Sequence, residues 1–306
     1  MRAHAWAGLW GLAACMVLAG CPARPARQPA ARLPAVRRPA ETFPRSGDDY
    51  PWARTEATFE PLAARFAPPA GFSRVPVAEG SWGEWLRNLP LRPAGTPVRG
   101  RDGGVIVPSD SPHLAAVVDM DVRSNQECAD TILRLRAEYL WSSGEQDAIS
   151  VPLTTGGSLS WADWRSGVRP SLVDERLQLR RTARPSASRA SFEGYLDAVF
   201  TWCGTYNLAA AGTRVRLADV QTGDYVVHAG SPGHAVLIAD LARNGAGQRA
   251  ALFLQGYMPA QSAHILASSR AEPWFRLDPS RPLDTPFWGE FAWAELRRFG
   301  GTRLPR

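Results

Sequence analysis

The amino-acid composition changes near residue 50, and this change limits which part of the chain can fold. Residues 22 to 50 are rich in Pro, Ala and Arg and carry few large apolar side chains. Such a segment cannot bury a hydrophobic core and is expected to act as an extended spacer. Aromatic residues are frequent after Tyr50, and the remaining stretch of about 250 residues suffices for one large domain. The sequence therefore predicts a disordered tether over residues 21–50 and a single folded domain over residues 51–306.

The first twenty residues have the pattern of an export signal. A short basic start is followed by an almost wholly apolar run over residues 5 to 17, and Leu-Ala-Gly then precedes Cys21. The apolar run is shorter than the about 20 residues that cross a bilayer. These residues resemble the lipobox of bacterial lipoproteins, which implies that residues 1–20 form a signal peptide and that Cys21 carries the lipid anchor.

The same resemblance gives an expected location. Residue 22 is Pro and not Asp, the residue that retains lipoproteins in the inner membrane of Gram-negative bacteria. The resemblance therefore implies a lipid-anchored protein of the cell envelope, at the outer membrane and facing the periplasm.

The net charge of +6 belongs to the N-terminal segment. Seven arginines and one acidic residue precede residue 47, which leaves 28 basic and 28 acidic residues for the rest of the chain. A domain that binds nucleic acid carries a basic face of its own. The charge distribution therefore excludes nucleic acid as a partner.

Only two of the four cysteines, Cys128 and Cys203, fall in the predicted domain. In an oxidising compartment they can form a disulfide; alternatively, one is a nucleophile and the other belongs to the core. The chain has no Cys-x-x-Cys motif and no Cys/His cluster with zinc spacing, so we expect neither a metal site nor another cofactor.

Apolar periodicity predicts a mixture of helices and strands. Helices are predicted over residues 82–86 with Ser81 as N-cap, over 128–141, and from Ser191 to about Leu208. Strands are predicted over residues 114–122, 149–154, 225–228, 234–241 and 250–255, with a hairpin turn at Asn244-Gly245. Helices that precede an antiparallel sheet predict an α+β fold.

Three of the predicted strands carry a polar pattern. A Gly-Asp turn at residues 223–224 leads into the first strand, Gly233-His234 opens the second, and Gln255 ends the third. This pattern resembles the second half of the papain-like amidases of the cell wall, the NlpC/P60 and CHAP groups. The resemblance implies a papain-like core of helices plus antiparallel sheet, with an N-terminal extension, in which His234 is the base and Gln255 orients its imidazole.

The position of the nucleophile departs from that resemblance. In NlpC/P60 enzymes the Cys begins the helix just before the Gly-Asp strand, and here Phe192 stands at that place. Cys203 lies about three helical turns further on, on an apolar face typical of core. Cys128 is predicted to begin an earlier helix, where the helix N-terminus and a nearby His would favour the thiolate. It is a candidate nucleophile if the fold brings that helix end to His234.

A second resemblance covers most of the predicted domain. From residue 72 to about Trp288 the chain is similar to a bacterial lipoprotein family classed as a domain of unknown function (4846). The similarity is strongest over residues 126–130 and 134–140, with further matches at 85–91, 117–122, 232–235 and 255–261. The family pattern includes Cys128, whereas the position of Cys203 often holds Ala, which implies that Cys128 is the functional thiol.

Two functions of different kinds follow. The first is a thiol hydrolase that cleaves an amide in peptidoglycan peptides, with Cys128 as nucleophile, His234 as base and Gln255 as the orienting group. The second is a non-catalytic envelope lipoprotein that binds a wall fragment or a protein partner in the same cleft, and the absence of Cys at position 192 favours it.

A third interpretation concerns two carboxylates that share one face of a predicted strand. Asp119 and Asp121, with a His, would form a metal-dependent hydrolase; alternatively, they form salt bridges with Arg134 or Arg136.

Overall fold

The structure is a computed structural model that describes residues 50–52, 60–270 and 272–300. The predicted signal peptide, Cys21 and the tether up to residue 49 lie outside the described residues. Tyr50, the last residue of the predicted tether, is described and buried, with its ring centroid 4.9 Å from that of Trp85. Among the described helices, none combines the length and the apolar character that a membrane crossing requires.

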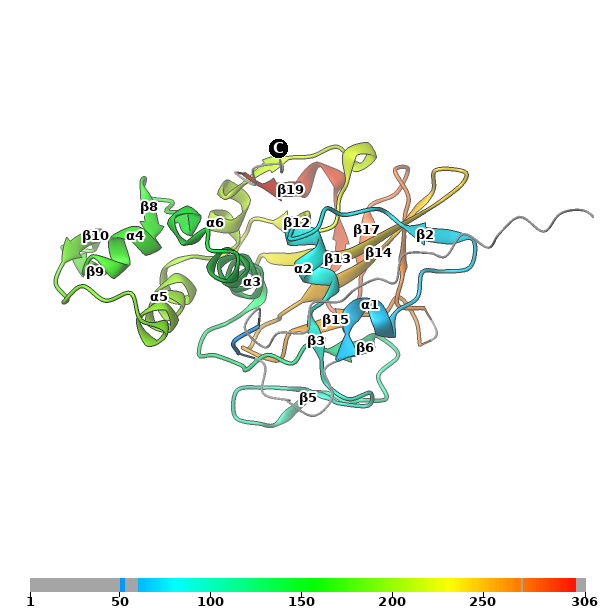
Figure 1. Ribbon diagram of the computed structural model, residues 1–306, viewed down its shortest axis with the longest axis horizontal. Coiled ribbons are helices and arrows are strands. Elements are labelled where there is room, and N and C mark those ends of the chain that lie inside the picture. The colour runs from blue at the N-terminus through cyan, green and yellow to red at the C-terminus, as the bar shows by residue number, and fades with distance from the viewer. Residues whose placement is uncertain (1–49, 53–59, 271, 301–306) are drawn as a thin grey trace, which may run out of the picture. The chain divides into compact units, whose positions relative to one another are not determined.

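One antiparallel sheet of nine strands organises the described residues (Figure 1). Seven strands lie side by side in the order β11-β19-β12-β13-β14-β15-β6, while β16 also pairs with β14 and β2 with β13. The strands are β2 (Phe72–Arg74), β6 (Leu114–Val117), β11 (Gly212–Arg214), β12 (Tyr225–His228), β13 (His234–Asn244), β14 (Arg249–Gln255), β15 (His264–Leu266), β16 (Phe275–Leu277) and β19 (Leu296–Phe299).

The longest pair in this sheet is the hairpin of β13 and β14, which turns after Asn244 as the sequence predicted. Almost every side chain of the two strands is buried, because apolar layers cover both faces of the sheet. This burial explains why the sequences of both strands are nearly continuous runs of apolar residues.

Helices cover one face of the sheet. They are α1 (Leu62–Arg65), α2 (Trp82–Arg87), α3 (Cys128–Ser142), α4 (Trp161–Arg165), α5 (Arg189–Trp202) and α6 (Thr205–Ala210), with short 3-10 turns at Gln146–Ala148, Leu217–Asp219 and Trp293–Glu295. α3 packs directly on β13 and β14, whereas α4 and α5 lie further from the sheet (Figure 1). Ser81 caps α2 as predicted, because its hydroxyl accepts a hydrogen bond from the Glu84 N–H at 3.3 Å.

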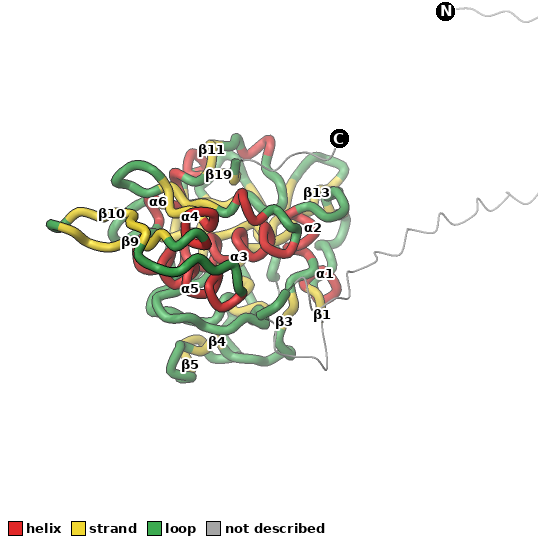
Figure 2. Tube along the Cα trace, turned by 60° about the vertical axis from the view of Figure 1, so that its left-hand side comes forward, coloured by secondary structure: helices red, strands yellow, loops and turns green. Residues whose placement is uncertain are grey.

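The other strands form small antiparallel pairs outside the main sheet. They are β1 (Glu60–Pro61) with β3 (Pro90–Leu91), β4 (Val98–Arg99) with β5 (Val105–Val107), β7 (Ser150–Pro152) with β8 (Ser158–Ser160), β9 (Val168–Val173) with β10 (Arg176–Arg181), and β17 (Leu283–Thr285) with β18 (Gly289–Phe291). Figure 2 shows the β9–β10 hairpin projecting from the helical side.

The predicted fold class is wrong. The described residues form nineteen strands and only six α-helices, so the architecture is mainly antiparallel β and not a papain-like core of helices plus sheet. Most of the unpredicted strands are two to four residues long, too short to show a period of two in the sequence. The helix predicted from Ser191 to Leu208 is also interrupted, since α5 ends at Trp202 and α6 begins at Thr205.

Candidate functional site

Cys128, His234 and Gln255 lie at one end of the β13–β14 hairpin. Cys128 is the first residue of α3, His234 is the first residue of β13, and Gln255 is the last residue of β14. The Cys128 thiol donates a hydrogen bond to the carbonyl oxygen of Gly233, with 4.0 Å between sulfur and oxygen. The backbone N–H of Ala235 also lies close enough to the sulfur to lower the pKa of the thiol. The sulfur therefore contacts the backbone beside His234, but neither nitrogen of the His234 ring hydrogen-bonds the sulfur, since Nε2 bonds Gln255 and Nδ1 has no partner among the described residues.

A glycine allows α3 to begin this close to the sheet. A Cβ atom on Gly256 would overlap Oγ1 of Thr131 and lie 2.9 Å from the carbonyl oxygen of Glu127. Thr131 donates a hydrogen bond to that carbonyl at 2.8 Å, and the Glu127 N–H donates to Asp130 Oδ2 at 3.0 Å. These contacts hold the first turn of α3 against the end of β14, and with it the position of Cys128.

A chain of hydrogen bonds determines the tautomer of His234. His264 Nδ1 lies 2.9 Å from the carbonyl oxygen of Ser262, which can only accept, so this nitrogen carries the hydrogen. The other nitrogen of His264 then accepts from Gln255 Nε2 at 3.1 Å, which directs Gln255 Oε1 towards His234 Nε2 at 2.8 Å. His234 Nε2 is therefore the N–H of that ring, and Nδ1 keeps its lone pair.

His234 Nδ1 is the atom of this cluster that can accept a proton. It is buried and has no hydrogen-bond partner among the described residues. A neutral imidazole with an unused lone pair is the form that acts as a general base. Orientation of the ring by a third group is the arrangement that activated nucleophiles share.

His264 was not predicted as part of the site. It is 1% exposed, and it supports Gln255 from the neighbouring strand β15. The only signal in the sequence is that this His lies between the apolar residues Ala263 and Ile265. That pattern indicates a strand but does not indicate a partner for the side chain.

Burial makes the resting thiol and imidazole neutral. It raises the pKa of Cys128 to about 11, although the backbone N–H groups of Ala235 and Ala129 oppose the shift. Burial also lowers the pKa of His234 to about 4 and that of His264 to about 4. Near neutral pH the pair is therefore a thiol and a neutral imidazole, and not a thiolate–imidazolium pair.

The raised pKa of Cys128 predicts how its alkylation depends on pH. Since the thiolate is the nucleophile and its fraction grows tenfold per pH unit below the pKa, the iodoacetamide rate should rise about tenfold per unit from pH 7 to pH 10. Mass spectrometry of the modified peptide measures this rate for Cys128 alone, with the Cys128→Ser variant as the blank. A rate that is constant from pH 6 upward would show a preformed thiolate and contradict the neutral resting pair.

Aromatic side chains cover the site. The rings of Tyr257, Trp288 and Phe291 lie 4.8, 5.2 and 5.9 Å from the His234 ring, centroid to centroid. Tyr257 donates a hydrogen bond at 2.7 Å to the carbonyl oxygen of Phe287, in the turn between β17 and β18. Under this cover Cys128 is 3% exposed and His234 is 0% exposed. A substrate can reach the imidazole only if part of this cover moves.

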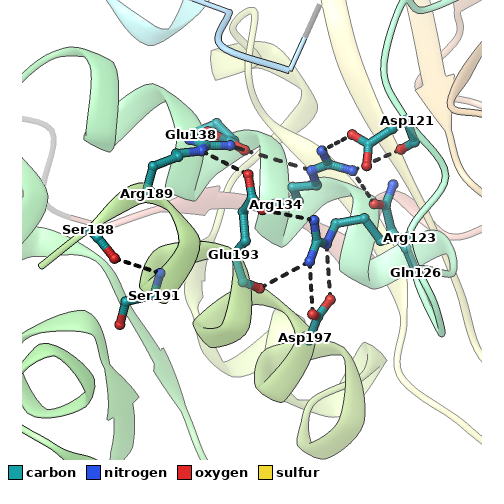
Figure 3. A network of polar contacts seen from close by, with 10 residues as sticks. All are labelled: Asp121, Arg123, Gln126, Arg134, Glu138, Ser188, Arg189, Ser191, Glu193 and Asp197. Atoms are coloured by element: carbon teal, nitrogen blue, oxygen red, sulfur yellow. Dashed lines mark hydrogen bonds and ion pairs between the residues drawn. The ribbon is translucent and has the colours of Figure 1, made fainter. Parts of the chain in front are cut away.

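A buried ion network anchors the segment that leads into α3 (Figure 3). Arg134, 1% exposed, donates to the carboxylate of Asp121 and at 2.6 Å to Oε1 of Gln126, two residues before Cys128. Glu138 accepts two hydrogen bonds of 2.6 Å from Arg189 on α5. The network therefore ties the segment before Cys128 to α3, and α3 to α5.

The remaining candidates have structural positions. Asp121 pairs with Arg134 and Asp119 with Arg92 at 3.3 Å, so the salt-bridge interpretation holds for Asp121. Within the described ranges no three His, Cys, Asp or Glu side chains gather as a metal site would require.

Cys128 and Cys203 are both free thiols, so the structure contains no disulfide between them. Phe192, at the position where the resemblance expects Cys, is 0% exposed, and its ring lies 4.4 Å from that of Trp141. It therefore belongs to the core.

Fold and site together define a mainly antiparallel β protein with a buried thiol, imidazole and amide at the end of its central hairpin. The chain matches the family model described as a domain of unknown function (4846) over residues 62–298, which is most of its length, and it belongs to that family. No curated protein and no solved structure matches the chain.

Proposed function

We propose that this protein is a lipid-anchored thiol amidase of the bacterial cell envelope that cleaves amide bonds in peptidoglycan peptides. One observation carries the proposal: Gln255 holds His234 with its Nδ1 lone pair unused, while the Cys128 thiol hydrogen-bonds the carbonyl oxygen of Gly233, the residue before His234 in the chain. A core histidine has no need of a free acceptor atom, because burying one without a hydrogen bond costs free energy.

The proposed reaction has two steps. In the first, Nδ1 of His234 accepts the thiol proton while Sγ of Cys128 attacks the carbonyl carbon of the amide. The C–N bond breaks as His234 returns the proton to the departing nitrogen, which leaves an acyl thioester on Cys128. In the second, Nδ1 deprotonates a water that attacks the thioester, and the acid leaves as Cys128 recovers its proton.

Other features of the site assist these steps. The first N–H groups of α3 carry the positive end of the helix dipole, which stabilises negative charge on the sulfur and on the carbonyl oxygen. The bond between Gln255 and His234 Nε2 persists when the ring becomes charged, since both forms of the ring donate from that nitrogen. Exclusion of water by Tyr257 and Trp288 strengthens these electrostatic interactions after substrate enters.

The anchor belongs to the same proposal. A lipid on Cys21 and a spacer of Pro, Ala and Arg would hold the neutral domain at the outer membrane, facing the periplasm, within reach of the wall. Electrophoretic mobility of the mature protein and mass spectrometry of its N-terminal peptide test this, since Cys21→Ser should abolish the acyl modification.

The test of catalysis uses purified protein and soluble peptidoglycan peptides. We expect wild type to release new amino groups, measured by amine labelling and by mass spectrometry of the products. Cys128→Ser and His234→Asn should each lower the rate by at least a hundredfold, because each removes a group that acts in the first step. Loss of activity in both variants, with their folds intact by circular dichroism, supports the proposal.

Cys203→Ala is the matched control, because it removes the other buried thiol without touching the cluster at His234. It should keep wild-type activity. Release of fragments by Cys128→Ser at the wild-type rate would overturn the thiol mechanism.

The burial of Cys128, His234 and Gln255 favours a second candidate, a non-catalytic binder of a wall fragment or protein partner. A binder should retain the same peptidoglycan peptides in equilibrium dialysis and leave them intact by mass spectrometry. If the protein is a binder, the Cys128→Ser variant should bind these peptides as tightly as wild type, because the thiol plays no part in recognition.

A further inference from the structure

A cavity of about 300 Å³ lies between α3, β7 and the end of β19. Apolar side chains line part of it, including Leu133, Ala137 and Leu140 from α3, Val151 from β7 and Phe299 from β19, and polar atoms make up a comparable share of its surface. Its volume is that of a small ligand pocket. A pocket that combines apolar side chains with a few polar groups suits an organic ligand with one polar end.

One charged side chain, Arg136, lines this cavity. Arg136 is 6% exposed, and its Nη1 is fully buried without a hydrogen-bond partner. Among the described residues, other arginines of the core form ion pairs with carboxylates, but Arg136 forms none. A guanidinium remains protonated in a protein, so the cavity contains a buried positive charge that lacks an anion.

Aromatic rings compensate this charge only in part. The guanidinium carbon lies 5.6 Å from the ring centre of Trp82, 5.2 Å from that of Tyr139 and 5.6 Å from that of Phe299. These ring faces attract a cation. They do not supply an acceptor atom in the plane of the guanidinium, which is where the N–H groups of Nη1 point. Burial lowers the pKa of Arg136 below its ordinary value, while the acidic group acting on it, Glu145, is exposed.

The neighbouring arginine of the same helix shows how this fold treats a structural guanidinium. Arg134 is also buried, yet Asp121, Gln126 and Glu138 surround it with acceptors. Arg136, two residues on, has no comparable partner and faces a cavity. The difference indicates that the partner of Arg136 comes from outside the described chain.

We propose that this cavity binds a small organic acid with one carboxylate group and an apolar body, and that the carboxylate pairs with Arg136. The planar guanidinium matches the two oxygens of a carboxylate, and the apolar wall suits an aliphatic chain or an aromatic ring. The proposal is independent of Cys128 and of any reaction at His234.

Calorimetric titration of the full-length protein tests the ligand class. Hexanoate and benzoate are compared with hexanamide and benzamide, which keep the shape and lose the charge, and with inorganic phosphate, which lacks the apolar body. We expect at least one of the two acids to bind at least tenfold more tightly than its amide and than phosphate. Equal affinities for acid and amide, or no binding of either acid at millimolar concentration, would overturn the proposal.

Variants test the role of Arg136. Arg136→Met keeps the side-chain length and removes the charge, so it should weaken binding of the acid at least tenfold and leave amide binding unchanged. Arg169→Met is the matched control, because Arg169 lies on β9 with its guanidinium 3.8 Å from the ring of Trp164, and it should bind like wild type.

If Arg136→Met does not fold, Val151→Phe replaces it, because it reduces the cavity volume and keeps the guanidinium. This variant should also weaken binding of the acid at least tenfold. Wild-type affinity for the acid in either folded variant contradicts the proposed site.

Discussion

Glu138→Gln should lower the free energy of unfolding by about 3–5 kcal/mol, because it removes the anion from a buried ion network. Glu138 is 0% exposed, and both of its oxygens accept hydrogen bonds of 2.6 Å from Arg189. Its carboxylate also lies 3.8 Å from Nε of Arg134. The amide of Gln keeps one acceptor but turns an N–H₂ group towards a guanidinium that has only donors. Urea denaturation at neutral pH measures the loss.

Glu193→Gln is the control for this prediction. Glu193 pairs with the same Arg189 at 3.3 Å and with Arg123 at 3.7 Å, but its side chain is 42% exposed. Exposed pairs contribute little in water, so the loss should stay below about 1 kcal/mol. Similar losses for the two variants would mean that burial of Glu138 does not control the energetics of the network.

The network also relates stability to the candidate site. Arg134 joins Asp121 and Gln126, which precede Cys128 in the chain, to the helix that Cys128 begins (Figure 3). The segment before α3 is therefore positioned by buried charge, in addition to the apolar packing of the helix. For this reason we expect Glu138→Gln to lower activity as well as stability, although Glu138 contacts neither Cys128 nor His234 directly.

The parts of the fold that the sequence predicted are the long elements with strong apolar patterns. β12 has the predicted bounds, β13 and β14 form the predicted hairpin, and α3 begins at Cys128 as the pattern indicated. Each of these elements buries enough side chains for its period to be visible in a single sequence. The short strands β2 and β16 do not, because pairing with β13 and β14 determines their conformation. β6 falls within the predicted strand over residues 114–122 but ends at Val117.

In the candidate site, too, local sequence predicted some of the arrangement, and contacts between distant segments determined the rest. His234 and Gln255 come from adjacent strands of one hairpin, so local sequence was enough to place them near each other. The approach of Cys128 to the backbone of Gly233 depends on contacts between segments about a hundred residues apart, which no local pattern encodes. The same is true of His264, whose role follows from the pairing of β15 with β14.

The papain-like resemblance failed as a prediction of fold for a related reason. It rested on three strands and a helix end, and it made no statement about residues 60–107 or 264–299. Those regions contribute many of the short strands that make the protein mainly β. A few polar residues on one hairpin describe a local arrangement, and the surrounding architecture can differ.

Gly256→Ala should move Cys128 away from the start of β13 and lower the proposed amidase activity by about a hundredfold. The added Cβ would overlap Oγ1 of Thr131 and lie 2.9 Å from the carbonyl oxygen of Glu127, so the first turn of α3 must shift away from β14. Overpacking of this kind costs about 1–3 kcal/mol of stability. The kinetic effect should exceed the effect on stability, because the sulfur moves together with the helix end. Steady-state kinetics and urea denaturation of the same preparation measure the two effects.

Gly245→Ala is the matched control, since Gly245 lies in the turn of the same hairpin and an added Cβ there meets nothing within 4 Å. Its activity should equal that of wild type.

Thr131→Ala in the Gly256→Ala background supplies a test of the mechanism. Removing Oγ1 relieves the closest overlap of the added Cβ and leaves its contact with the Glu127 carbonyl, so activity should recover in part. This recovery is expected although Thr131→Ala also removes the 2.8 Å hydrogen bond from Thr131 to that carbonyl. Partial recovery in the double variant means that the two substitutions are coupled through the position of the helix end. Purely additive losses would instead mean that Gly256 acts on activity by a route other than the approach of α3 to β14.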